Sequence, residues 1–139
     1  MALKAILDTM FYFSYYNPEN REMAAWSKLI IQKISKGQIK VASSAITVTE
    51  LYNTMGKILG VDTVKIRIAS AKSSNINIIP VTEDIAELAG RITLNTPKIP
   101  LADAIIASAA LIHAKGVLVT DDEHFKTIKG TKVKWLSDL

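Results

Sequence analysis

The sequence of 139 residues contains no cysteine. This absence excludes disulfide scaffolds, cysteine-ligated zinc, iron–sulfur clusters and thiol catalysis. The two histidines, His113 and His124, are too few for a three-histidine zinc site. Long apolar runs are also lacking, because residues 104–114 contain Ser108 and His113 and fall short of the ~20 residues that a membrane span needs. We therefore expect a cytoplasmic protein with no membrane segment, since a chain without cysteine suits a reducing compartment.

The composition is that of an ordinary folded domain. Hydrophobic residues make up 49% and charged residues 22% of the chain. At ~150 residues per domain, we expect one domain over residues 1–139. Seventeen basic and thirteen acidic residues give a net charge of +4. A basic balance favours an anionic partner such as nucleic acid. On charge alone, a soluble protein that happens to be basic is an equally good interpretation.

Short apolar runs alternate with stretches of helical periodicity, which predicts an α/β fold around a parallel sheet. The expected strands are 2–7, 39–43, 75–80, 117–120 and 132–136. The expected helices are 20–35, 44–59, 61–72, 82–94 and 101–114. In open sheets of this kind ligands bind beyond the carboxyl ends of the strands, so the residues that follow each strand are the candidates for a site.

Five acidic residues occupy unusual positions. Asp8 follows the first expected strand, Asp121 and Asp122 follow the fourth, and Glu50 and Asp103 lie in apolar helices with no adjacent lysine or arginine. Burying a lone carboxylate is costly, and two carboxylates ~4 Å apart repel by about 4 kcal/mol at an effective dielectric near 20. Convergence on a shared cation resolves both problems, and oxygen ligands select hard cations such as Mg²⁺ or Mn²⁺.

Each acid taken alone has a simpler explanation. Asp8 could cap the helix or turn that follows the first strand. Asp103 could complement the dipole of its helix from the first turn, and Glu50 could be a partly exposed helix residue. One member of the Asp121–Asp122 pair also suits a plain cap or turn. The joint pattern, rather than any single acid, therefore predicts the site.

Five segments in a fixed order resemble a known family. They are 7–9 (LDT), 46–51 (ITVTEL), 81–92 (VTEDIAELAGRI), 99–111 (IPLADAIIASAAL) and 118–133 (LVTDDEHFKTIKGTKV). Over essentially its whole length, the chain resembles the PIN domains and, among them, the VapC-like toxin ribonucleases of prokaryotic toxin–antitoxin pairs. The resemblance implies a three-layer α/β/α, Rossmann-like domain with a central parallel sheet of about five strands.

The resemblance also implies an activity, namely Mg²⁺-dependent hydrolysis of RNA phosphodiester bonds, with Mn²⁺ as a substitute and no organic cofactor. The family's four catalytic and metal-binding acids fall on Asp8, Glu50, Asp103 and Asp122, the last within a Thr-x-Asp-x-x-Phe pattern. The secondary contributors fall on Asp121, Thr120 and Thr9. One departure is Met10, where the family often has serine or asparagine. The implied partners are a small antitoxin, an RNA substrate and a second copy of the chain.

Three other functions compete. A haloacid-dehalogenase-like phosphatase needs Asp-x-Asp-x-Thr after the first strand, and residues 8–12 lack the second aspartate. A phosphoacceptor receiver domain needs its acidic pair after the first strand, whereas the pair here comes late. A non-catalytic PIN-like scaffold for RNA binding or processing stays open, although the intact acid set argues against it. We expect the aromatic residues at 11–16 to serve the core and an interface rather than base stacking, and His124 to lie at the surface.

Overall fold

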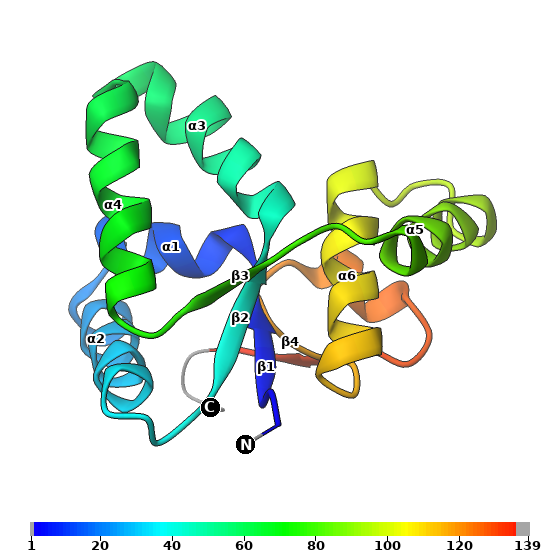
Figure 1. Ribbon diagram of the computed structural model, residues 1–139, viewed down its shortest axis with the longest axis horizontal. Coiled ribbons are helices and arrows are strands. Elements are labelled where there is room, and N and C mark those ends of the chain that lie inside the picture. The colour runs from blue at the N-terminus through cyan, green and yellow to red at the C-terminus, as the bar shows by residue number, and fades with distance from the viewer. Residues whose placement is uncertain (1, 136–139) are drawn as a thin grey trace.

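The computed structural model describes residues 2–135, which form a five-stranded parallel sheet with the order β3-β2-β1-β4-β5 (Figure 1). The strands are β1 (Ala5–Leu7), β2 (Val41–Ser44), β3 (Asn77–Ile79), β4 (Val117–Val119) and β5 (Lys132–Lys134). The predicted parallel sheet is confirmed. The last predicted strand ends earlier than expected, at Lys134, and its final residue, Leu136, lies outside the described residues.

Six α-helices and one short 3₁₀ helix, η1, accompany the sheet. They are α1 (Thr9–Tyr16), α2 (Arg21–Ser35), α3 (Ala45–Leu59), α4 (Val61–Ser73), α5 (Glu83–Asn95), α6 (Leu101–His113) and η1 (Glu123–Thr127). The side chains of Asn20, Ser44 and Thr82 accept hydrogen bonds from the first turns of α2, α3 and α5 and so cap these helices. Among residues 2–135, no helix is long and apolar enough to cross a membrane.

The sheet is buried on both faces, which gives three layers (Figure 1). Side chains alternate along each strand. Ile6 and Leu118 therefore belong to the core beneath α5 and α6, whereas Leu7, Val41 and Val119 belong to the core beneath α1 to α4. Parallel sheets require this double cover, which explains why the central strands β1 and β4 are apolar without alternation in the sequence.

The sequence pattern did not predict α1. This eight-residue helix has Phe11 and Tyr12 in the core, and Phe13 and Tyr16 packed partly against it. Because apolar residues surround the helix, it has no single apolar face, and periodicity gives no signal. The Tyr12 hydroxyl lies 2.7 Å from the Ser43 hydroxyl, which gives the buried phenol a hydrogen-bond partner. The predicted core role of the aromatic segment is confirmed for Phe11 and Tyr12.

The strand order changes direction at β1. From β1 the chain builds outward through β2 to β3, and it then returns to add β4 and β5 on the other side. The carboxyl ends of β1 and β4 are therefore neighbours, with Leu7 in register with Val119. Such a switch point is where ligands bind in open α/β sheets.

Candidate active site at the carboxyl edge of the sheet

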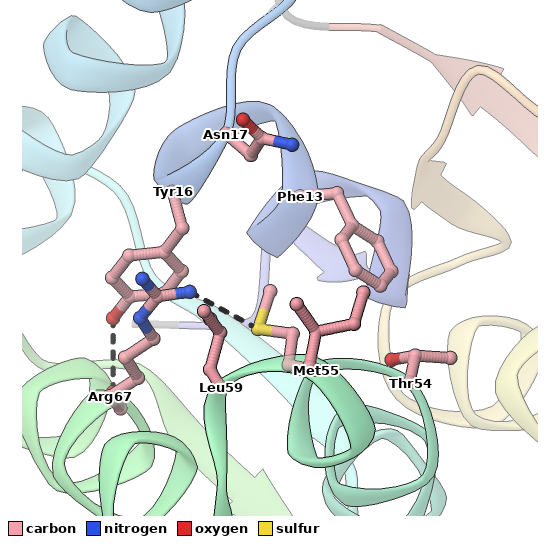
Figure 2. A pocket seen from close by; sticks show the side chains of 8 residues that line it. Phe13, Tyr16, Asn17, Thr54, Met55, Leu59 and Arg67 are labelled. Atoms are coloured by element: carbon pink, nitrogen blue, oxygen red, sulfur yellow. Dashed lines mark hydrogen bonds between the residues drawn. The ribbon is translucent and has the colours of Figure 1, made fainter.

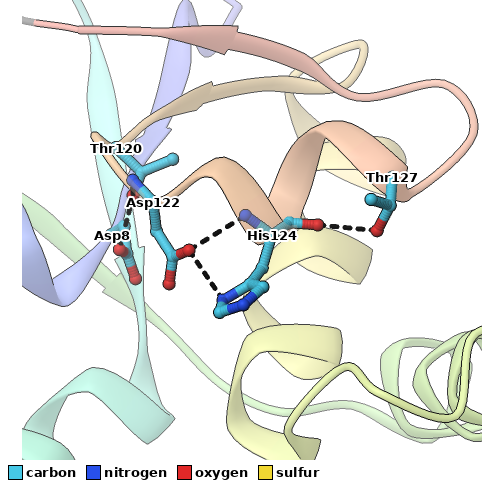
Figure 3. A network of polar contacts seen from close by, with 5 residues as sticks. All are labelled: Asp8, Thr120, Asp122, His124 and Thr127. Atoms are coloured by element: carbon cyan, nitrogen blue, oxygen red, sulfur yellow. Dashed lines mark hydrogen bonds and ion pairs between the residues drawn. The ribbon is translucent and has the colours of Figure 1, made fainter.

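Asp8 lies at the switch point, directly after β1, and is only 4% exposed. Its backbone N–H donates to the carbonyl of Val119 on β4 at 3.0 Å. Its carboxylate accepts a 2.8 Å hydrogen bond from the hydroxyl of Thr120, the residue that follows β4 (Figure 3). Although Asp8 occupies the N-cap position of α1, its side chain makes no capping hydrogen bond. The structure thus uses this carboxylate to join two strand ends.

Burial raises the pKa of Asp8 from 3.8 to about 6. The hydrogen bond from Thr120 and the nearby backbone N–H groups of Thr9 and Met10 act to lower the pKa, and the charge of Glu50 acts to raise it. No lysine or arginine contributes to this balance within the described part of the chain. The charged form of Asp8 is therefore disfavoured at this position.

Glu50 reaches the same edge from α3. It is half-buried, and its Oε1 accepts a 2.7 Å hydrogen bond from the hydroxyl of Thr9. The same Thr9 hydroxyl lies 3.2 Å from that of Thr47, one turn earlier on α3. Thr9 thus fastens the acid of α3 to the end of β1. Thr47 was missed in the sequence, although its spacing of three residues from Glu50 places both on one helix face.

Asp103 approaches from the first turn of α6. It is half-buried, and its carboxylate has no hydrogen-bond partner within residues 2–135. Burial is the largest cause that raises its pKa to about 7, and the charges of Asp8, Asp122 and Glu50 raise it further. His124 acts in the opposite direction. The four acids therefore share one electrostatic environment, although they come from four separate segments.

Asp122 is held by contacts on both sides (Figure 3). Its backbone N–H donates to the hydroxyl of Thr120 at 3.0 Å, and its Oδ1 accepts from the backbone N–H of His124 at 2.9 Å, which caps η1. The ring Nδ1 of His124 also lies 2.9 Å from Oδ1. The expected surface position of His124 is confirmed, since its side chain is 68% exposed, but its contact with Asp122 was not predicted.

Asp121 points to different surroundings. Asp121 is exposed as a residue, but its carboxylate is partly desolvated. This desolvation, together with the charges of Asp122 and Glu19, raises its pKa. Neither Asp8 nor Asp103 contributes to that shift. Asp122 therefore belongs with the acids at the switch point, and Asp121 faces the cavity beside them.

A model of the PIN domain family matches residues 5–130. This chain belongs to the PIN domain family. Similar solved structures include VapBC2 from Rickettsia felis bound to promoter DNA, with 20% identity over 94% of this chain and 97% of that chain, and a TM-score of 0.71. A toxin–antitoxin complex from Klebsiella pneumoniae shares 25% identity over 92% of this chain and 95% of that one, with a TM-score of 0.63.

The PIN domain fold of this chain also resembles that of Mycobacterium tuberculosis VapC20, described as a Sarcin-Ricin loop cleaving toxin. The identity is 16%, over 88% of this chain and 92% of that chain, and the TM-score is 0.69. A comparison with curated protein sequences finds no match. The predicted α/β/α fold around a parallel sheet is confirmed.

The acids of this PIN domain have the chemistry of a site for a hard divalent cation. All the donors are oxygens, and the raised pKa values of Asp8 and Asp103 arise from desolvation and repulsion, which a nearby cation would offset. As the side chains stand, the described residues include no group of three or more acids or histidines that could hold one ion. Joint ligation by Asp8, Glu50, Asp103 and Asp122 therefore stays a prediction.

Proposed function

We propose that this chain is a metal-dependent endoribonuclease, the toxin of a VapBC-type toxin–antitoxin pair, acting in the cytoplasm as a single PIN domain over residues 1–139. One observation gives the main support. The pKa of Asp103 is raised to about 7 by burial and by three further carboxylates, with no lysine or arginine among its causes. A scaffold protein has no need to gather uncompensated acids, whereas a hydrolase that binds a cation does.

The acids divide the work in the proposed mechanism. Asp8, Asp103 and Asp122 are the proposed inner ligands of Mg²⁺, or of Mn²⁺ in its place, and Glu50 is proposed to bind a second ion or to orient the attacking water. When bound, the cation supplies a lower pKa for water and neutralises charge on the phosphodiester. Water attacks phosphorus without help from the RNA 2′-hydroxyl, so we expect products with a 5′-phosphate and a 3′-hydroxyl.

Two threonines and a histidine hold three of these acids, Asp8, Glu50 and Asp122, in place. The Thr120 hydroxyl donates to Asp8 and accepts from the backbone N–H of Asp122, so one side chain fixes the separation of two acids. The Thr9 hydroxyl donates to Glu50 and so fixes that acid to the residue that follows Asp8. His124 restrains the rotation of the Asp122 carboxylate through its backbone N–H and its ring. Such supported side chains are what precise positioning of a substrate and its attacking water requires.

Cleavage of total cellular RNA tests the proposal. The purified protein is expected to cut RNA with Mg²⁺ or Mn²⁺ and not with EDTA, and mapping of the new ends is expected to find 5′-phosphates. Cutting in EDTA, or products with a 2′,3′-cyclic phosphate, would contradict the proposed hydrolysis. RNA binding without cleavage under any of these metals would instead support the alternative, a non-catalytic PIN-like scaffold.

An apolar groove between α1, α3 and α4 supports the proposal of an antitoxin partner (Figure 2). Its volume is about 300 Å³, and its lining includes Phe13, Tyr16, Ile58 and Leu59. Arg67 also lines it, with its guanidinium 4.4 Å from the centre of the Tyr16 ring. No carboxylate of the described residues forms an ion pair with Arg67. The groove thus suits an apolar segment that carries an acidic residue, and solved relatives include toxin–antitoxin complexes.

The groove lies close to the acids. Thr54, at its edge, donates from its hydroxyl to the backbone carbonyl of Glu50, one turn earlier on α3. An antitoxin segment in the groove would therefore lie beside the proposed catalytic centre. The expected homodimer stays a prediction. The exposed side chains of Val61 and Ile66, outside the groove, offer apolar surface for one.

Removing the Arg67 charge is expected to weaken antitoxin binding. With the cognate antitoxin, Arg67→Gln is expected to raise the Kd roughly 10-fold, because a charge-assisted hydrogen bond to a carboxylate contributes about 1.5–3 kcal/mol. Calorimetry of the purified pair measures this change. Lys72→Gln is the matched control, since it removes an equal charge from the exposed end of α4. Equal losses in both variants would mean that net charge, rather than the groove, attracts the antitoxin.

A further inference from the structure

A second cavity lies beside the acids, at the carboxyl ends of β4 and β5. Its volume is about 200 Å³, and Lys126 of η1, Lys134 of β5 and Trp135 line it together with Thr120 and Asp121. None of the four acids at the switch point belongs to its wall. Two neighbours of Asp122 in the sequence, Asp121 and Glu123, do belong to it. The cavity is therefore separate from the proposed cation site and adjacent to it.

Thr120 connects the cavity to the acids. Its hydroxyl donates to the Asp8 carboxylate at 2.8 Å, and its backbone N–H donates to the carbonyl of Lys134 at 2.9 Å. One residue thus contacts the proposed catalytic centre on one side and the wall of the cavity on the other. If a phosphodiester group of RNA binds at the acids, a neighbouring nucleotide of the same strand lies within reach of the cavity.

The lining has the chemistry of a nucleotide site. Trp135 is half-buried, packs partly against the core that contains Leu7 and Val119, and lines this cavity and a smaller one of about 40 Å³ beside Met10. Aromatic side chains bind unpaired bases by stacking, whatever their sequence, and lysines bind the adjoining phosphates. Lys134 is exposed, so its ammonium can reach a bound phosphate at small desolvation cost.

The remaining charged groups assign the two parts of the nucleotide. Lys126 pairs with Glu123 at 3.0 Å, and both side chains are well exposed, so this contact is weak and exchanges readily. Asp121 and Glu123 place carboxylates in the cavity wall, where they accept hydrogen bonds from base N–H groups and repel phosphate. The phosphate therefore suits Lys134 and Lys126, and the base suits Trp135 and the carboxylates of the wall.

We propose that this cavity is a subsite for one unpaired nucleotide of the RNA, next to the bond that is cut, with its base stacked on Trp135 and its phosphate bound by Lys134 and Lys126. The inference rests on the proposed function, because it takes RNA as the substrate. It adds a single-strand requirement at a defined position, which the four acids alone do not impose.

Binding of a short fluorescein-labelled single-stranded RNA of mixed sequence tests the subsite. The protein carries Asp103→Asn, so that it binds without cutting, and anisotropy gives the Kd with Mg²⁺ present. Adding Trp135→Leu is expected to weaken binding roughly 10-fold, because leucine fills the apolar contact but cannot stack. Adding Trp135→Phe, which keeps an aromatic face, is expected to stay within roughly 3-fold of the parent.

Lysine variants in the same binding experiment test the phosphate contact. Lys134→Gln is expected to reduce the slope of log Kd against log salt concentration by about one. Lys36→Gln removes an equal charge after α2, before β2 begins and thus at the opposite edge of the sheet, and is expected to leave this slope unchanged. Thermal melting of every variant identifies any loss that comes from the fold alone.

The outcomes separate the subsite from the proposed function. Unchanged binding by Trp135→Leu, equal losses in the leucine and phenylalanine variants, or a parent that binds no RNA would each overturn the subsite. Wild-type cleavage of cellular RNA is measured independently. If the wild type cleaves RNA but Trp135→Leu binds RNA as tightly as its parent, only the subsite is rejected. If Trp135→Leu weakens binding but the wild type does not cleave, the cavity still binds RNA and the nuclease proposal is rejected.

Discussion

The Asp103→Asn variant is expected to cleave RNA about 1,000-fold more slowly than the wild type, which corresponds to about 4 kcal/mol of transition-state stabilisation. Asparagine keeps the size and shape of the side chain but cannot carry the negative charge. Asp103 is the acid whose pKa responds to all three of the others, so its charge is the one most dependent on a shared cation. Initial rates on a defined RNA at saturating Mn²⁺ measure the loss.

A matched control separates catalysis from helix electrostatics. Asp62 also lies in the first turn of a helix, α4, and is exposed. If Asp103 only complements the dipole of α6, then Asp62→Asn and Asp103→Asn lose similar small amounts of stability and no activity. We expect Asp62→Asn to cleave at the wild-type rate. An Asp103→Asn variant that retained more than about a tenth of the activity would remove Asp103 from the centre.

The position of the acids at one edge could be predicted because it depends on local rules. A parallel sheet brings the carboxyl ends of its strands to the same edge, and Asp8 and Asp122 each closely follow a short apolar strand. The family resemblance placed the fourth acid on Asp122, but the strand pattern alone left the choice between Asp121 and Asp122 open. Successive residues near a strand end face opposite ways, and which one faces Asp103 depends on the register of β4 with β1, a contact between segments more than a hundred residues apart.

Other features depend on packing that periodicity does not encode. Helix α1 is apolar on all sides, so its helical spacing is hidden, and without α1 the groove beside Arg67 cannot be deduced. The cavity at Trp135 arises where β5 joins the edge of the sheet beside η1. Both hollows form between segments distant in sequence, whereas the threonines that hold the acids adjoin Asp8 and Asp122 closely enough to be found from motifs.

Asp8→Asn is expected to stabilise the metal-free protein above neutral pH. The pKa of Asp8 rises from 3.8 to about 6 in the folded protein. At 1.36 kcal/mol for each pH unit, this rise amounts to a penalty of about 3 kcal/mol for folding with an ionised Asp8. Asparagine avoids the penalty, and its amide oxygen can still accept the hydrogen bond from Thr120. Urea denaturation in EDTA measures the difference in the free energy of unfolding.

The pH dependence gives this effect its sign. Between pH 3.8 and about 6 the folded state holds more protons on Asp8 than the unfolded chain does, so the contribution of Asp8 to stability falls as the pH rises. Below this window both states are protonated and the penalty vanishes, and above it the penalty is complete. The gain from Asp8→Asn is therefore expected to be near zero at about pH 3 and full at about pH 8.

Adding a metal ion is expected to reverse the order of stability of the wild type and the Asp8→Asn variant. A cation that binds only the folded state adds RT ln(1 + [L]/Kd) to its stability, and loss of a ligand raises the Kd. Mn²⁺ at pH 8 is therefore expected to stabilise the wild type strongly and Asp8→Asn little, although the variant is the more stable protein in EDTA. A variant that is less stable than the wild type by the same amount in EDTA and in Mn²⁺ would assign Asp8 a purely structural role. A stability difference between variant and wild type that changes sign between EDTA and Mn²⁺ cannot come from a purely structural contact, because such a contact is present with or without the ion. Repulsion among the acids, in contrast, is relieved only when a cation is bound.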